Sequence, residues 1–242
     1  MIFLIVSIVS AVSLNAEDAA PLINLSVAAV DEPAQFVKTI NIAVILMLFV
    51  LAPTLLLMVT SFTRLIIVFG LLRQALGLQQ SPPNQIIISL SLILTFFIME
   101  PYAKKAWDNG IDPYMKETIN YEVAFDESVG PFKEFMIKNT REKDLALLYR
   151  IKKQENPKNI EDVSLTLLMP AFIISELRTA FEIGFLVFLP FLVIDIIVAS
   201  ILMSLGMMML PPVMISLPIK LIFFIIIDGW HLIIGNLAQS FK

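Results

Sequence analysis

Three long stretches of this sequence contain no charged residue. The stretches without Asp, Glu, Lys or Arg are 39–63, 74–99 and 196–219. Each is longer than the about 20 residues that an α-helix needs to cross a hydrocarbon core about 30 Å thick. Because a lipid environment offers no hydrogen-bond partners, a segment that crosses it must satisfy its own backbone, as a helix does. The sequence therefore predicts a protein built from several membrane-spanning helices.

The composition agrees with a membrane protein and excludes several other classes. Of the 242 residues, 58% are hydrophobic and only 16% are charged, against about 25% charged residues in a typical soluble domain. The net charge of −4 gives no basic excess for binding nucleic acid. The chain has no cysteine and a single histidine, His231, which excludes disulfides and a multi-histidine metal site within one chain. We expect no cofactor.

The first 16 residues have the pattern of a signal peptide. Residues 1–14 form a short apolar run, and it ends in Leu14-Asn15-Ala16, whose small last residue a signal peptidase favours. We interpret residues 1–16 as a cleaved signal peptide and residues 17–39 as a mobile polar N-terminus. The n-region contains no Lys or Arg, so an uncleaved membrane anchor is the alternative.

Four spans are predicted in the remainder of the chain, at 40–60, 84–99, 179–205 and 213–237. The first two belong to a helical hairpin at 40–99, and the last two to a second hairpin at 165–242 that contains a Met-rich loop. Between the hairpins, residues 100–164 hold most of the charge in the chain. Apolar residues recur there at helical spacing, which predicts a small polar helical insert outside the lipid.

The predicted orientation follows from the signal peptide. A cleaved leader delivers residue 17 outside, so the short loop with Arg64 and Arg73 lies in the cytoplasm and the polar insert in the periplasm. Two arginines in a short loop agree with the positive-inside rule, which discounts long loops. An uncleaved anchor would favour the inverted topology.

Six charged residues fall within the last two predicted spans or at their entry: Glu176, Arg178, Glu182, Asp195, Lys220 and Asp228. A lone charge at the bilayer centre costs about 3 kcal/mol on insertion scales, so these groups must pair or face water. Arg178 and Glu182 are four residues apart and share a helix face, whereas Lys220 needs Glu176 or Asp195. We expect these charges to bridge hairpins, within or between subunits. Snorkelling to the interface and, for Asp195, a proton relay are the alternatives.

The loop between the last two predicted spans contains Met207, Met208 and Met209. Methionine is unbranched and polarisable, so several such side chains can close around an irregular opening and form a hydrophobic seal in a pore. The alternative is packing between helices, and the pattern alone favours packing.

Three prolines lie within the predicted spans, at Pro53, Pro190 and Pro218. Each removes one helix hydrogen bond, so we predict that they act as helix breakers. Broken backbone at membrane depth is tolerated where it is buried in protein or lines a cavity. Bent hairpins in a larger assembly are the functional interpretation, and ordinary kinking is the alternative.

The sequence does not predict an enzyme. Asp195 and Asp228 on adjacent spans could mimic an intramembrane aspartyl protease, but Asp228 does not close a Gly-x-Gly-Asp turn. A phosphate-binding glycine loop, a nucleophile elbow and a His-Glu-x-x-His motif are also missing. A small-solute transporter or ion channel is the other alternative, suggested by midplane charges and broken helices, although few spans and no internal repeat argue against it.

Several ordered strings along the chain carry a family resemblance. In the first half they are TSFTR at 60–64, LLRQALG at 71–77 and QQSPPNQ at 79–85. In the second half they are SELRTAF at 175–181, PFLVID at 190–195, GMMM at 206–209 followed by two prolines, LPIK at 217–220 and DGW at 228–230. From about residue 40 to its end, the chain resembles the FliP family of flagellar biosynthetic proteins, whose injectisome counterparts are the SctR proteins.

This resemblance implies an all-α membrane protein in which two kinked helical hairpins flank a small polar helical insert and assemble into an oligomeric conical pore. The expected partners are further copies of the chain, FliQ- and FliR-like subunits, FlhB- and FlhA-like export components, membrane lipid and unfolded flagellar export substrates. The expected location is the flagellar basal body in the bacterial inner membrane. Met207 to Met209 match a methionine gasket, which makes the pore seal the favoured interpretation. The leader and the long insert favour the flagellar branch over the injectisome branch.

Overall fold

The computed structural model describes residues 33–154, 157, 162–207 and 210–241. Every regular element in these ranges is a helix, which confirms the all-α fold class. The chain divides into two units, Met1–Val50 and Leu51–Lys242. In the first unit the described residues belong to helix α2 (Pro33–Met58), which continues into the second unit. The predicted signal peptide at 1–16 lies outside the described residues.

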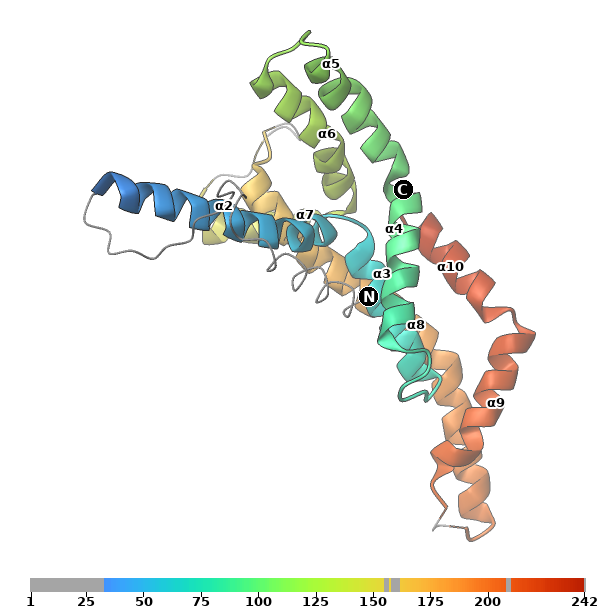
Figure 1. Ribbon diagram of the computed structural model, residues 1–242. Helices are drawn as coiled ribbons and strands as arrows, with labels where there is room; N and C mark the ends of the chain where they lie inside the picture. The colour runs from blue at the N-terminus through green and yellow to red at the C-terminus, as the bar shows by residue number, and fades with distance from the viewer. Residues whose placement is uncertain (1–32, 155–156, 158–161, 208–209, 242) are drawn as a thin grey trace, which may run out of the picture. The chain divides into compact units, whose positions relative to one another are not determined.

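The second unit contains the remaining helices (Figure 1). They are α3 (Phe62–Ala75), α4 (Asn84–Ala106), the π-helical turn η2 (Trp107–Ile111), α5 (Asp112–Met115), α6 (Tyr121–Asn139), α7 (Glu142–Ile151), α8 (Leu165–Ser204), α9 (Pro212–Ile226) and α10 (Gly229–Gln239).

Helix α3 occupies most of the segment that the sequence predicted as a cytoplasmic loop. The predicted loop is wrong, because the segment between the two predicted spans has the periodicity of an amphipathic helix; its cytoplasmic location stays a prediction. Leu65, Val68, Phe69 and Leu72 follow helical spacing, and all four are buried. They pack against α4 and α8. Arg64 is buried on the same helix, so it does not contribute to an exposed positive loop.

Helix α4 does not end where the polar segment begins. The predicted span ended at residue 99, but the helix continues through Glu100 to Ala106 and leads through η2 into α5. The chain then reverses, and α6 packs against both α4 and η2. The change from apolar to polar residues shows where a helix leaves an apolar environment, but its backbone hydrogen bonds can continue beyond that point. The insert is therefore an extension of α4 folded back through α6.

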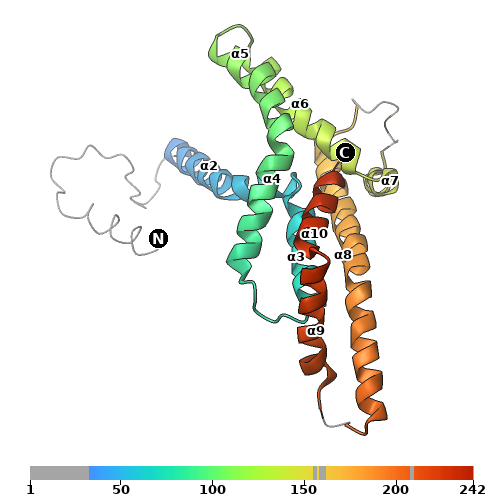
Figure 2. The same cartoon turned by 90° about the vertical axis from the view of Figure 1, so that its right-hand side faces the viewer.

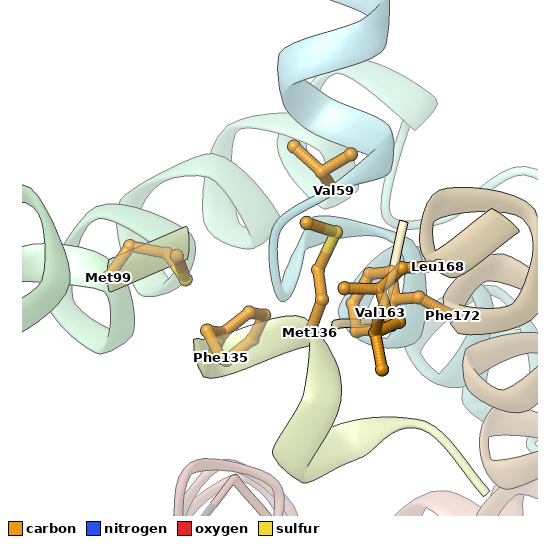
Figure 3. Packing of buried hydrophobic residues seen from close by; sticks show 7 residues of the cluster. All are labelled: Val59, Met99, Phe135, Met136, Val163, Leu168 and Phe172. Carbon is orange, nitrogen blue, oxygen red and sulfur yellow. The ribbon is translucent and has the colours of Figure 1, made fainter. Parts of the chain in front are cut away.

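One apolar cluster joins the insert to the N-terminal part of α8. Its buried members are Val59, Met99, Phe135, Met136, Val163, Leu168 and Phe172 (Figure 3). Phe135 on α6 lies edge-on to Phe172 on α8, with ring centroids 5.8 Å apart. Aromatic pairs in this geometry add about 0.5–1.5 kcal/mol beyond the area they bury. This cluster fixes the insert against α8.

Helices α8 and α9 form the second hairpin, and both views show them side by side (Figures 1 and 2). Helix α8 is 40 residues long and begins well before the predicted span at 179. The predicted fourth span is not one straight helix, because α9 and α10 meet at an angle of 65°. Asp228 at the junction has a left-handed backbone, with φ of 51° and ψ of 53°.

Among the described residues, two helices are long and apolar enough to cross a membrane, Asn84–Met115 and Leu165–Ser204. The bent pair α9 and α10 becomes a third if it counts as one broken span. Within α2, the apolar run Ile40–Leu51 is shorter than a span. The most apolar windows of the two long helices are only 22% and 17% buried within the chain. Their apolar surface therefore needs lipid or other protein to cover it.

Candidate functional site

A buried arginine connects four parts of the second unit. Arg64 on α3 donates from Nε to Glu176 Oε2 on α8 at 2.8 Å, and from Nη2 to Glu176 Oε1. Its Nη1 donates to the backbone oxygen and to Oγ of Ser240, at 3.0 and 2.8 Å, while Nη2 also reaches Asn139 Oδ1 on α6 at 3.2 Å. The ring of Phe241 lies 3.8 Å from Cζ. Arg64 therefore ties α3, α6, α8 and the C-terminal end together.

This network differs from the pairing that the sequence predicted for Glu176. Glu176 was a candidate partner for Lys220, but its carboxylate is fully buried and held by Arg64. Sequence reasoning missed Arg64 because it assigned that residue to a loop. A lone arginine inside a helix-periodic apolar segment was the available signal, since such a group must find a carboxylate.

The second ion pair joins the arms of the α8–α9 hairpin. Lys220 Nζ on α9 lies 2.6 Å from Asp195 Oδ2 on α8 and donates to the backbone oxygen of Ala75 at 3.0 Å. Ser216 Oγ donates to Asp195 Oδ1 at 2.6 Å. The Lys220 side chain is only 5% exposed, whereas that of Asp195 is 39% exposed. Of the two carboxylates that the sequence offered to Lys220, the fold brings Asp195 to it, within one chain.

The third charged group lies where the insert meets α8. Arg178 Nε donates to Glu182 Oε1 at 3.1 Å, the i,i+4 contact that the spacing predicted. Arg141, which the sequence analysis did not single out, donates to the same carboxylate from both Nη atoms, at 3.2 and 2.6 Å. The hydrogen bond to Glu182 raises the pKa of Arg141 above its usual value. The backbone N–H of Arg141 also donates to Ser175 Oγ, which in turn donates to Asp144 Oδ2.

Asp228 is exposed and makes no ion pair with any residue that the structure describes. It was predicted inside a span among the bridging charges. It lies instead at the bend between α9 and α10, where its backbone N–H bonds to the oxygen of Ile225 and its own carbonyl accepts from Leu232. Asn and Asp tolerate the left-handed region better than most residues. Its observed contribution is to the bend.

The three prolines that were predicted as helix breakers all lie within helices, and their bending of the hairpins stays a prediction. Pro53, Pro190 and Pro218 lie inside the continuous helices α2, α8 and α9, so none of them ends a helix. Each removes one hydrogen bond, but the ladder on either side continues. The break in the last predicted span lies at residues 227 and 228 instead.

The turn between α8 and α9 begins with a left-handed glycine. Gly206 has a φ of 74°, a conformation that glycine adopts without steric cost. Met207 follows, and its exposed fraction is 43%; the nearby Met203 and Leu210 are also exposed, at 63% and 44%. Met208 and Met209, the other two residues of the predicted seal, lie outside the described residues. The described part of this turn therefore presents apolar side chains at the end of the hairpin.

The described part of the chain contains no group of three or more His, Asp or Glu side chains that could hold a metal ion. The arrangement is one of paired charges inside an apolar helical framework. Such pairs hold helices in register and keep charge out of an apolar environment.

Comparison with known proteins agrees with the strings found in the sequence. The model of the FliP family matches residues 45–237. The flagellar biosynthetic protein FliP of Bacillus subtilis is 48% identical over 210 residues, which cover 87% of this chain and 95% of that protein. Those of Caulobacter vibrioides and Pectobacterium carotovorum are each 52% identical, over 79% and 78% of this chain and 72% and 73% of their own lengths. The chain belongs to the FliP family.

Proposed function

We propose that this chain is a pore-forming subunit of a flagellar type III protein export gate in the bacterial inner membrane. In this role it passes unfolded flagellar subunits outward, and a Met loop seals the closed pore. Its partners are further copies of itself, FliQ- and FliR-like subunits, and FlhB- and FlhA-like export components. Membership of the FliP family supports this assignment, because the relatives are named flagellar biosynthetic proteins.

One observation carries the proposal: the α8–α9 hairpin exposes apolar side chains along both arms. On α8 these include Leu189, Leu192, Val193, Ile196, Ile197 and Ile201, and on α9 they include Val213, Met214, Ile219, Ile222, Ile225 and Ile226. The largest apolar patch on a typical soluble monomer is about 300–600 Å². A hairpin that is apolar along both arms favours burial on more than one side, by neighbouring subunits as well as by lipid.

The ion pair of Asp195 and Lys220 supports a hairpin that acts as one rigid piece. It joins the two arms within the chain, so the hairpin enters an assembly preformed. The Met turn then lies at the end of a stiff arm. In a ring of such arms, the turns of several copies meet at the axis and close the opening with polarisable side chains.

The polar insert completes the proposed placement. Residues 100–164 extend from α4, lie on the periplasmic side and surround the exit of the conduit. Their exposed charges suit water, whereas the apolar arms of α8 and α9 suit the membrane or the assembly interior. Transport energy comes from outside this chain.

Assembly is tested by native mass spectrometry of the full chain purified from inner membranes in mild detergent. We expect a large complex that contains several copies of this chain together with FliQ- and FliR-like chains. A monomer that persists when those partners are co-expressed, in cells that remain motile after deletion of the gene, would contradict the proposal.

The seal is tested by replacing Met207, Met208 and Met209 together. Serine at all three positions should make cells leak small ions, because short polar side chains cannot exclude water from the opening. Leucine at all three positions is the matched control and should keep the pore tight. Both variants should assemble, as native mass spectrometry checks. Equal permeability of an assembled serine variant and the parent would refute the sealing role.

A further inference from the structure

An open groove runs between α3 and α4, with an apolar floor and one polar end. Its volume is about 410 Å³, whereas a cavity of about 15 Å³ is enough to hold one water molecule. The apolar lining comes from Phe62, Ile66, Gly70 and Ile88, and the polar end from Arg73 and Asn84. From Arg73 to Phe62 the helix rises about 16 Å at 1.5 Å per residue. The groove therefore suits an extended, flexible apolar chain.

Gly70 leaves the middle of the groove open. A Cβ at this position would meet no heavy atom within 4 Å. The contrast with Gly184 on α8 is informative, because a Cβ there would come within 2.2 Å of Leu71 Cδ1. Gly184 permits close helix packing inside this chain, whereas Gly70 faces space that the described residues do not fill.

Arg73 at the polar end is a cation without a carboxylate among the described residues. Its Nη1 donates to the backbone oxygen of Pro82 at 3.2 Å and to Asn84 Oδ1 at 2.7 Å, and both acceptors are neutral. A guanidinium has five N–H donors, and the three on Nε and Nη2 have no partner in the described part of the chain.

The charge on Arg73 therefore calls for an anion from outside the described residues. The contacts to Pro82 and Asn84 orient the guanidinium at the mouth of the groove and leave its other edge available. That edge presents parallel N–H groups, the geometry that binds phosphate oxygens in pairs. Residues 74–99 contain no charged side chain, and Glu100, the first carboxylate on α4, lies about 24 Å along the helix from Asn84, so the anion does not come from the part of α4 that lines the groove.

We propose that this groove binds an anionic phospholipid, with its phosphate on Arg73 and one acyl chain along Ile66, Gly70 and Ile88. Basic pockets between membrane helices are known to hold anionic headgroups. A free phosphate would leave the apolar floor uncovered. A zwitterionic lipid also offers a phosphate, but its own cation would leave a net positive charge beside Arg73, which an anionic lipid neutralises. The groove thus matches both halves of one molecule, an anionic head and an apolar tail.

The test is native mass spectrometry of the full chain in mild detergent, titrated with phosphatidylglycerol or phosphatidylethanolamine. We expect the parent to retain phosphatidylglycerol preferentially. Arg73→Gln should lower that preference about fivefold, which is what one cation contributes at an anionic surface. Gly70→Leu should reduce the retention of both lipids, because the new side chain fills the groove.

Gly235→Leu is the matched control for the glycine variant. Gly235 also lies in a helix, and a Cβ there would meet no heavy atom within 4 Å, but it does not line the groove. Its lipid retention should equal that of the parent. The lipid proposal requires only that the chain lies in a membrane. The same spectra therefore report the oligomer, which tests the proposed function, separately from the bound lipid, which tests the groove.

A photo-reactive phosphatidylglycerol identifies the occupant in intact membranes. We expect cross-links to peptides that contain residues 62–73 and 84–88. A photo-reactive side chain at Ile88 that captures residues 33–50 or another protein chain instead of lipid would overturn the proposal. An unchanged lipid preference in Arg73→Gln would do the same.

Discussion

The ammonium of Lys220 lies 2.6 Å from a carboxylate oxygen of Asp195 and 3.0 Å from the backbone oxygen of Ala75. One side chain on α9 is thereby held by both α8 and the end of α3. Because the pair forms within one chain, the hairpin does not need a neighbouring subunit to neutralise it. The charges of Asp195 and Lys220 therefore serve first to fix the hairpin.

Reversing one charge of this pair should separate the arms. Lys220→Glu places two carboxylates together and should abolish assembly of the complex and motility. Exchanging both, as Asp195→Lys with Lys220→Asp, should restore part of the assembly, limited by the Ala75 oxygen, which the new carboxylate would face. Native mass spectrometry and swarming in soft agar measure the two effects. Lys152→Glu at an exposed position is the control, and normal assembly of Lys220→Glu would contradict the role of the pair.

The buried Arg64 should be essential for stability. Arg64→Met leaves the carboxylate of Glu176 buried without its partner, and breaking a buried pair costs about 3–5 kcal/mol. Replacing both residues, as Arg64→Met with Glu176→Met, should recover most of that loss because no buried charge remains. The thermal unfolding midpoint of the detergent-solubilised protein ranks the variants by stability. Arg178→Met is the control, because it removes an exposed arginine and should change the thermal midpoint little. If the double variant is no more stable than Arg64→Met alone, the buried carboxylate is not the cause of the loss.

Gly110 should be required where η2 packs on α6. A Cβ at Gly110 would lie 2.1 Å from Ser128 Oγ and 2.8 Å from the backbone oxygen of Ala124. The hydroxyl can rotate but the backbone cannot, so Gly110→Ala should destabilise the insert by about 1–3 kcal/mol, as overpacking does. Faster amide hydrogen exchange across α6 checks this. Gly130→Ala is the control, since its Cβ would meet nothing within 4 Å and alanine should slow exchange there.

Arg141 should couple α7 to α8. Arg141→Gln removes both contacts to Glu182, so amide exchange in Glu142–Ile151 should rise while exchange in α3 stays constant. Lys143→Gln, an exposed neighbour outside the network, is the comparison. If amide hydrogen exchange across α7 is the same in the two variants, the contacts of Arg141 with Glu182 do not hold the insert against α8.

Helix content and helix location followed from short-range features. Charge-free length and helical spacing are properties of consecutive residues, and they predicted the apolar helices around 84–99 and 179–205. Spacing also predicted the contact of Arg178 with Glu182, because residues four apart on a helix always lie close. The helix α3 was within reach of the same reasoning, but the segment was treated as a connection between two spans and its apolar periodicity was not used.

The sequence by itself determined that this chain is helical, apolar over lengths that suit a membrane, and a member of its family, because composition, periodicity and ordered motifs are all local. Only the tertiary structure decided that Glu176 meets Arg64 while Lys220 meets Asp195, and that the last predicted span bends at Asp228. Each of those outcomes depends on which helices pack together. Charges far apart in sequence become partners only when packing brings their helices within a side-chain length.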